Sequence, residues 1–286
     1  MKYIFFGTPE FAAIILEKLL GAGFVPQAVV CNPDRPVGRK KIITSPPVKA
    51  GIMNQEARIK NQIKILQPEN LSLLHNSLFM LHPDFFIVAA YANIIPGEIL
   101  KIPKMGAVGV HPSLLPKYRG PSPIQTAILN GEEETGVTLY LLDEKMDHGP
   151  IIENRKWKIE NRTTYLELQK QLAELGGNLL VETIPKFLAG EIKPQPQNEE
   201  LATYTKKFVS EDAFVDEDAL KNAISGENKE GALLIERKIR ALNPEPGVWT
   251  IQNGKRVKLL EAEIKDNELR LKKIQTEGKK PRPCGI

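Results

Sequence analysis

The sequence predicts an α/β protein that begins with a parallel sheet and ends with a small β-rich domain. In the first half, short apolar runs alternate with stretches of helical periodicity, which is the pattern of parallel strands joined by crossover helices. Later in the chain the pattern changes to short alternating strands. The 286 residues, 42% of them hydrophobic, are enough for two filled cores. We expect a first domain over 1–189, a linker over 190–205 and a second domain over 206–286.

The first strand is expected at Lys2–Phe6, followed at once by a helix. Thr8 is a favoured N-cap, and Pro9 and Glu10 are favoured in a first turn, so the helix is expected to begin there and to run to about Leu20. The turn between strand and helix lacks the glycine spacing of a dinucleotide fingerprint, so a nicotinamide cofactor is not expected.

Five further apolar runs are expected to complete the sheet. Asp84–Ala90 is continuous and apolar, which suits a strand covered on both faces. Thr163–Leu188 is expected to be one long helix, with Gly176 and Gly177 as a weak point. The other expected elements are strands at Ala28–Cys31, Ile63–Leu66, Ala107–Val110 and Val137–Leu142 and a helix at about Ser122–Asn130.

The segment after residue 190 is rich in proline and polar residues, which is typical of a linker. Beyond it, alternating strands are expected at Trp249–Gln252, Val257–Glu263 and Leu269–Ile274, with Asn253-Gly254 as a hairpin turn. A small barrel of the oligonucleotide-binding type fits this pattern.

The positive charge of the chain is concentrated near its end. The formal net charge is only +4, but from residue 254 onward ten Lys or Arg stand against five Asp or Glu, whereas residues 206–253 have seven against nine. Such a local excess favours a face that meets a polyanion, although a solvated lysine-rich surface remains an alternative.

Neither a secretory signal nor a membrane span is expected. The apolar run after Lys2 is too short for a signal peptide, and no later run approaches the length of a span. Cys31 and Cys284 have no metal or disulfide spacing. A cytoplasmic enzyme is therefore expected.

Two segments place chemically active residues at strand ends. His111 ends an apolar run within Val-Gly-Val-His-Pro-Ser-Leu-Leu-Pro-Lys-Tyr-Arg-Gly, and Asp147 follows the next strand within Met-Asp-His-Gly. Open α/β sheets bind ligands at such strand ends. A histidine can move protons near neutral pH and a carboxylate can orient it, so these two are the catalytic candidates. Adding the adjacent His148 gives no metal-ligand spacing, so no metal is expected.

These motifs resemble the signature of the folate-dependent formyltransferases. Further matches, to the branch that acts on methionyl-tRNA, lie at Phe6–Phe11, at Asn32–Lys41, at Ala90-Tyr91 with Pro96, at Ile239–Pro244 and at Gln275–Lys280. The resemblance implies a Rossmann-like formyltransferase domain followed by a tRNA-binding domain. It also implies that a monomer transfers a formyl group from 10-formyltetrahydrofolate to the α-amino group of initiator methionyl-tRNA.

The resemblance also assigns roles to residues. His111 would stabilise the tetrahedral centre and aid proton transfer, and Asp147 would set the charge and orientation of His111. The folate-binding residues that it implies are Ser113, Leu114, Leu115, Pro116, Tyr91 and Asp143. The basic residues expected to contact tRNA are Arg35, Arg39, Lys40 and Lys41 in one loop and Lys272 and Lys273 in the C-terminal strands.

Gly109 departs from the family pattern. The family carries an asparagine at this position, whose amide donates to the oxyanion, and the loss of one such donor typically costs ~3–4 kcal/mol of transition-state stabilisation. Asn93, after the neighbouring strand, is a candidate substitute, although a plain loop asparagine is at least as good an interpretation. If the missing amide limits the rate, Gly109→Asn should raise turnover.

Gly109 leaves alternatives open: a slow enzyme, or a silent tRNA- or folate-binding homologue. A formyltransferase for a sugar amine and a formyltetrahydrofolate hydrolase are also compatible with the fold, but the basic loop and basic C-terminal region argue against both. The tail after Gly278 differs from the family's usual closing helix, which leaves open whether the C-terminal domain is shortened.

Overall fold

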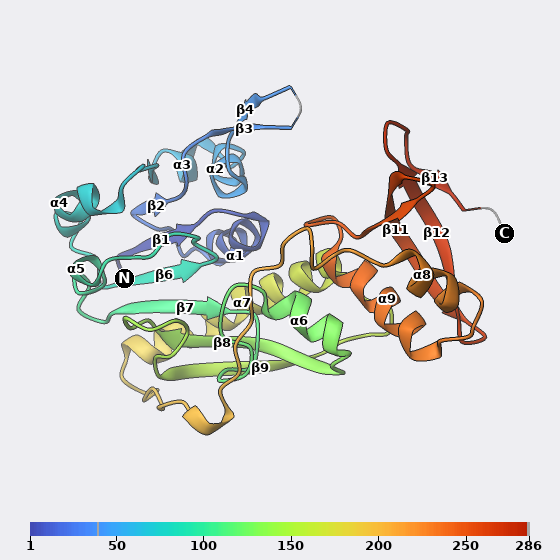
Figure 1. Ribbon diagram of the computed structural model, residues 1–286. Coiled ribbons are helices and arrows are strands. Elements are labelled where there is room, and N and C mark those ends of the chain that lie inside the picture. Colours follow the sequence, from blue (N-terminus) through green and yellow to red (C-terminus); the bar gives the residue numbers. More distant parts are fainter. Residues whose placement is uncertain (39, 285–286) are drawn as a thin grey trace. The chain divides into compact units, whose positions relative to one another are not determined.

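Figure 1 shows the computed structural model of the chain, which describes residues 1–38 and 40–284. The chain forms two compact units. Unit 1 comprises Met1–Arg119, Thr135–Trp157 and Gln169–Tyr204, and unit 2 comprises Gly120–Glu134, Lys158–Leu168 and Thr205–Ile286. Each unit thus draws on separate parts of the sequence, while the domain boundaries expected from the sequence remain a prediction.

Unit 1 is built on a sheet of seven strands in the order β5-β2-β1-β6-β7-β8-β9. The strands from β5 to β7 pair in parallel, and β8 pairs with β7 in the antiparallel direction. The strands are β1 (Tyr3–Gly7), β2 (Ala28–Val30), β5 (Lys64–Leu66), β6 (Phe85–Ala89), β7 (Ala107–His111), β8 (Glu134–Leu141) and β9 (Ile151–Lys158). The expected parallel sheet is confirmed, with β8 running in the reverse direction and with β9 as an addition.

The middle of this sheet is its core. Every residue of β1 and β7 is buried, as continuous apolar runs covered on both faces require. Phe6 of β1 packs against Phe86 of β6, with ring centroids 5.0 Å apart. This packing holds the strand that ends at His111 in place.

The first helix, α1 (Glu10–Gly21), begins one position later than the sequence suggests. Its N-cap is Pro9, which offers no side-chain acceptor. The Thr8 hydroxyl instead accepts a hydrogen bond from the Asn32 backbone amide at 3.2 Å. The predicted capping by Thr8 is therefore wrong, because the threonine ties two loops together instead.

The long helix α7 (Tyr165–Leu188) is continuous through its two glycines, so the predicted weak point is wrong. A Cβ on Gly177 would lie 2.7 Å from Lys18 Cβ, and one on Gly176 would lie 3.0 Å from Val110 Cγ1. Both glycines are therefore needed for close packing of α7 against α1 and the sheet.

The remaining elements of unit 1 are short. They are α2 (Pro47–Met53), α3 (Ala57–Lys60), the 3₁₀ turns at Leu71–Leu74 and Glu199–Leu201, α4 (His75–Phe79), α5 (Gly97–Leu100) and a two-stranded hairpin of β3 (Arg35–Val37) and β4 (Ile42–Thr44). The hairpin replaces the plain basic loop that the sequence suggests. Among the described residues, no helix has the length and apolar character that a membrane crossing would need.

Unit 2 contains an antiparallel sheet in the order β10-β11-β12-β13. Its elements are α6 (Pro123–Asn130), α8 (Glu217–Ile224), α9 (Lys229–Leu242), β10 (Trp249–Gln252), β11 (Lys255–Lys265), β12 (Glu268–Thr276) and β13 (Arg282–Pro283). Asn253 and Gly254 both have positive φ, as a tight hairpin turn requires, so this turn is confirmed. The β-rich second domain is confirmed as a sheet, and its closure into a barrel stays a prediction.

Candidate active site

The structure brings the two catalytic candidates together at the carboxyl end of β7. His111 is the last residue of β7, and its Nδ1 lies 3.7 Å from Asp147 Oδ2. Its other ring nitrogen, Nε2, lies 2.8 Å from the backbone oxygen of Tyr118. A carbonyl oxygen only accepts, so Nε2 carries a proton, and the carboxylate beside Nδ1 favours a second proton there. The ring is thus held in one orientation, with only 7% of its side chain exposed.

Asp147 adopts an unusual backbone conformation. Its φ is +50°, a left-handed conformation that non-glycine residues rarely adopt and that is often found at functional sites. The Gln197 side-chain amide fixes this loop by donating to the backbone oxygens of Asp147, at 2.9 Å, and Gly149, at 2.8 Å. The loop is therefore held by a residue 50 positions later in the chain.

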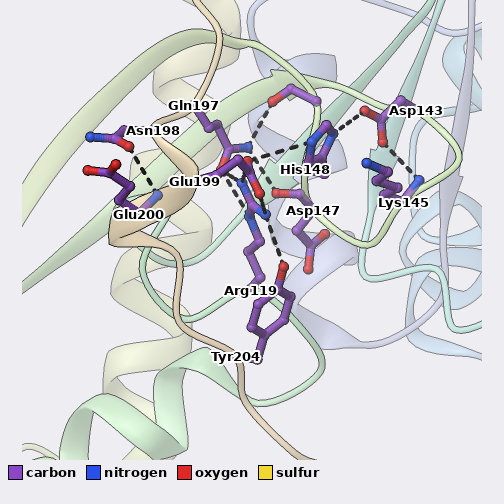
Figure 2. A network of polar contacts seen from close by, with 11 residues as sticks. Arg119, Asp143, Lys145, Asp147, His148, Gln197, Asn198, Glu199, Glu200 and Tyr204 are labelled. Atoms are coloured by element: carbon purple, nitrogen blue, oxygen red, sulfur yellow. Dashed lines mark hydrogen bonds and ion pairs between the residues drawn. The ribbon is translucent and has the colours of Figure 1, made fainter.

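The network in Figure 2 is centred on Arg119, which sequence reasoning did not single out as a site residue. Its side chain is fully buried, and its guanidinium donates to Gln197 Oε1 at 2.7 Å, to Glu199 Oε1 at 2.6 Å and to the Tyr204 hydroxyl at 3.2 Å. The available signal was the Tyr-Arg-Gly motif, but its partners lie about eighty positions away. The network fixes a segment expected to be a linker onto the Asp147 loop.

The side chains of the Asp147 loop also contact one another. His148 Nδ1 donates to Asp143 Oδ2 at 2.6 Å, and the other oxygen of Asp143 accepts from the Lys145 backbone amide at 2.9 Å. His148 Nε2 lies 3.6 Å from Glu199 Oε1 (Figure 2). His148 therefore faces Asp143 and Glu199 in this network.

Gly109 lies under an aromatic ring. It pairs directly with Tyr140 across β7 and β8, and a Cβ on Gly109 would lie 2.4 Å from Tyr140 Cε1. The Tyr140 hydroxyl donates to Asp147 Oδ1 at 2.6 Å. The expected substitute, Asn93, is exposed and donates its amide to Asn32 Oδ1 at 2.9 Å. Asn93 thus bonds outside the His111–Asp147 pair, while Tyr140 bonds to it.

The loop predicted to contact folate is folded against β8. The Ser113 hydroxyl donates to the Lys117 backbone oxygen at 2.6 Å, and the Ser113 carbonyl accepts from Thr138 Oγ1 at 2.7 Å. Leu115 is buried, whereas Leu114 and Pro116 are half-buried. Folate contact by these residues stays a prediction.

The predicted folate residue Tyr91 follows β6 and packs into the core. Its ring meets Phe6 edge-on, with centroids 5.6 Å apart. Burial raises the pKa of Tyr91 above its ordinary value, so its hydroxyl remains protonated at neutral pH. Its role toward folate likewise stays a prediction.

The predicted tRNA-binding residues of unit 1 lie on the β3–β4 hairpin. Arg35 forms an exposed ion pair with Glu69 at 3.1 Å, and Lys40 and Lys41 lie in the turn, where Lys41 is exposed. Arg39 lies outside the described residues. The apolar side chains Val37, Ile42 and Ile43 of this hairpin are exposed as well.

The two predicted tRNA-binding lysines of unit 2 both lie on β12 and are both ion-paired. Lys272 Nζ lies 2.7 Å from Glu263, and Lys273 Nζ lies 2.9 Å from Glu261. Each side chain is a little less than half exposed. The glutamates reduce the positive field of this strand, so its contribution to tRNA binding stays a prediction.

No metal centre is found among residues 1–38 and 40–284, since no three His, Cys, Asp or Glu side chains there are placed to hold an ion together. The polar contacts described above use carboxylates and histidines in pairs and with amides. This geometry supports proton transfer and charge stabilisation by side chains.

Comparison with known proteins identifies the family. Residues 1–184 match the model of the formyl transferase family, and residues 229–279 match that of the formyl transferase C-terminal domain. The chain is 42% identical over 255 residues to a methionyl-tRNA formyltransferase of Enterococcus faecalis, covering 88% of this chain and 76% of that protein. It is 40% identical over 265 residues to the protein of the same name from Halalkalibacterium halodurans, covering 92% and 78%.

Solved structures share the fold. The methionyl-tRNA formyltransferase from Clostridium thermocellum matches with a TM-score of 0.62 at 17% identity, covering 96% of this chain and 98% of that one. HypX from Aquifex aeolicus, solved with tetrahydrofolic acid, matches with a TM-score of 0.66 at 19% identity, covering 99% and 46%. With both of its domains matched and relatives at about 40% identity over most of its length, this chain belongs to the formyl transferase family.

Proposed function

We propose that this chain transfers the formyl group of 10-formyltetrahydrofolate to the α-amino group of methionyl initiator tRNA. The observation that carries the proposal is the His111–Asp147 contact of 3.7 Å, built from two motifs of a chain that is 42% identical to a protein of that name. The folate supplies an activated formyl carbon, and the methionyl amine is the nucleophile.

In the proposed mechanism, the His111 ring works as a cation. Protonated at Nε2 toward Tyr118 and at Nδ1 toward Asp147, the ring can stabilise the oxyanion that forms when the amine attacks. It can also donate a proton to the nitrogen that leaves the tetrahedral centre. Asp147 compensates the ring charge and fixes the ring orientation, and the burial of both groups strengthens this interaction.

Binding is assigned to separate regions. Ser113, Leu114, Leu115, Pro116, Tyr91 and Asp143 are proposed to contact the folate, which lies next to the His111–Asp147 pair in this scheme. The basic hairpin with Arg35, Arg39, Lys40 and Lys41 is proposed to contact the end of the tRNA. Lys272 and Lys273 are proposed to contact its backbone. Because both catalytic residues come from one chain, we propose that the enzyme works as a monomer in the cytoplasm.

The test is transfer of labelled formyl from 10-formyltetrahydrofolate to charged initiator tRNA, followed by recovery of formyl-methionine. His111→Ala serves as the inactive control. Two further reactions contain a nucleotide-linked amino sugar or only water as acceptor. Product formed mainly with the sugar, or mainly as free formate, would overturn the proposal, and so would a wild-type rate no higher than that of His111→Ala.

A further inference from the structure

The pairing of β7 with β8 places Gly109 and Tyr140 opposite each other on the face of the sheet that carries His111. Residues two apart on a strand share a face, so Gly109 and His111 point the same way. Their cross-strand partners, Tyr140 and Thr138, point to that face too. Tyr140 is therefore a neighbour of the catalytic pair through strand register.

The Tyr140 ring takes the space that a side chain at position 109 would need. A Cβ there would lie 2.4 Å from Tyr140 Cε1, 2.7 Å from Tyr140 Cζ and 2.6 Å from Leu142 Cδ1. Real Cβ atoms essentially never approach so closely. The tyrosine and the family's asparagine cannot both be accommodated in this arrangement, and glycine is the residue that admits the ring.

The hydroxyl of this ring ends on the catalytic carboxylate. It donates to Asp147 Oδ1 at 2.6 Å, while Asp147 Oδ2 is the oxygen that faces His111 Nδ1. With one oxygen held by the tyrosine, the carboxylate cannot rotate away from the imidazole. Burial, followed by the nearby Asp147 charge, raises the pKa of Tyr140 well above its ordinary value, so the hydroxyl remains a donor at neutral pH.

We infer that Tyr140 is a positioning residue that acts through Asp147, and that Gly109 and Tyr140 together replace the family asparagine as a matched pair. This inference rests on the proposed formyl transfer. It means that Gly109 is compatible with full activity, and it reverses the expectation that Gly109→Asn alone would raise turnover. An asparagine side chain there collides with the tyrosine and displaces the hydroxyl from Asp147.

The first experiment measures kcat and KM of formyl transfer for Tyr140→Phe, which removes only the hydroxyl. We expect kcat to fall by about 10- to 100-fold, the effect of moving a reacting group by roughly an ångström, with both KM values unchanged. Tyr3→Phe is the matched control, because Tyr3 is also fully buried and donates its hydroxyl to a backbone oxygen, that of Phe24, at 2.8 Å. It should lower the melting temperature without lowering kcat.

The second experiment exchanges volume across the strand pair. Gly109→Asn and Tyr140→Val should each lower kcat, and the double variant should exceed both single variants by at least about tenfold, because only contacting residues couple in this way. Additive losses in the double variant would contradict a matched pair. An unchanged kcat in Tyr140→Phe would remove Tyr140 from the catalytic site.

A third measurement does not depend on activity. The imidazole nitrogen resonances of His111, recorded by NMR, should shift in Tyr140→Phe and stay constant in Tyr3→Phe. If the wild type transfers no formyl group but His111 still shifts, the proposed substrate is wrong and the positioning by Tyr140 stands. If the wild type transfers formyl and His111 does not shift, the inference about Tyr140 is wrong and the proposed function stands.

Discussion

The guanidinium of Arg119 lies 2.6 Å from the carboxylate of Glu199, although eighty residues separate them in the chain. Arg119 is fully buried, whereas the Glu199 side chain is 56% exposed. The pair thus connects the loop after His111 to the surface segment that also carries Gln197. Arg119 holds the segment, and Gln197 holds the backbone of Asp147.

This ion pair should make stability depend on pH in the acid range. The Arg119 hydrogen bond holds the pKa of Glu199 below its ordinary value. Since the folded-state pKa is the lower one, the stabilisation is fully present above the ordinary glutamate pKa of about 4.3 and is lost as pH falls through the folded value. In urea unfolding, Glu199→Gln should therefore be less stable than wild type near neutrality and equal to it in acid. Glu200→Gln, the exposed neighbour, should show no such difference; if it does, Arg119 is not the cause.

His111 and Asp147 should be needed for turnover and not for folding. We expect His111→Ala and Asp147→Asn each to lower turnover by ~2–4 orders of magnitude, the usual effect of losing a positioned proton-transfer group. Circular dichroism and melting curves should match those of His75→Ala, a histidine variant on α4. A folded variant of either residue with near-full activity would exclude that residue from the mechanism.

Arg39→Ala should lower tRNA-dependent activity and leave folate affinity unchanged, because its proposed role is to place the end of the tRNA. The measurements are transfer rate against tRNA concentration and folate binding by fluorescence. Lys60→Ala, a basic residue on α3, is the control for a general loss of positive charge. Equal losses in both variants would mean that the hairpin has no specific role.

Charge reversal of Lys272 and Lys273 should weaken tRNA binding evenly and reduce its salt dependence by about one unit of slope for each lysine–phosphate interaction that the substitution removes. Each lysine is already paired with a glutamate, so the tRNA must compete with Glu263 and Glu261 for them. Binding is measured across a salt series, with Lys229→Glu at the start of α9 as the control. If Lys272→Glu and Lys273→Glu leave the slope unchanged, the lysines serve only to pair the strands.

The sequence predicts best where one local pattern decides the structure. The continuous apolar run at Phe85–Ala89 needs no distant information to be identified as a buried strand. The motifs around His111 and Asp147 place both at strand ends, and the structure brings their side chains to 3.7 Å. In these cases the spacing along the chain is also the spacing in the fold.

The sequence predicts worst where a contact depends on register or on distant segments. Tyr140 is one apolar residue of a strand until the antiparallel pairing places it opposite Gly109. The weak point expected at Gly177 is a tight contact with Lys18, which belongs to another helix. Thr8 has the composition of a helix cap and bonds to Asn32 instead. Long-range packing decided each of these positions, and no local propensity contains that information.

The hydrogen bonds of Gln197 limit how this chain can be divided in the laboratory. The first family match ends at residue 184, which makes that position a natural choice for cloning the N-terminal domain alone. Such a fragment would lack the amide that holds the Asp147 and Gly149 carbonyls and the acceptors that Gln197 and Glu199 offer to Arg119. A fragment that extends through Tyr204 keeps all of these groups. An expression design for this domain should therefore end after residue 204.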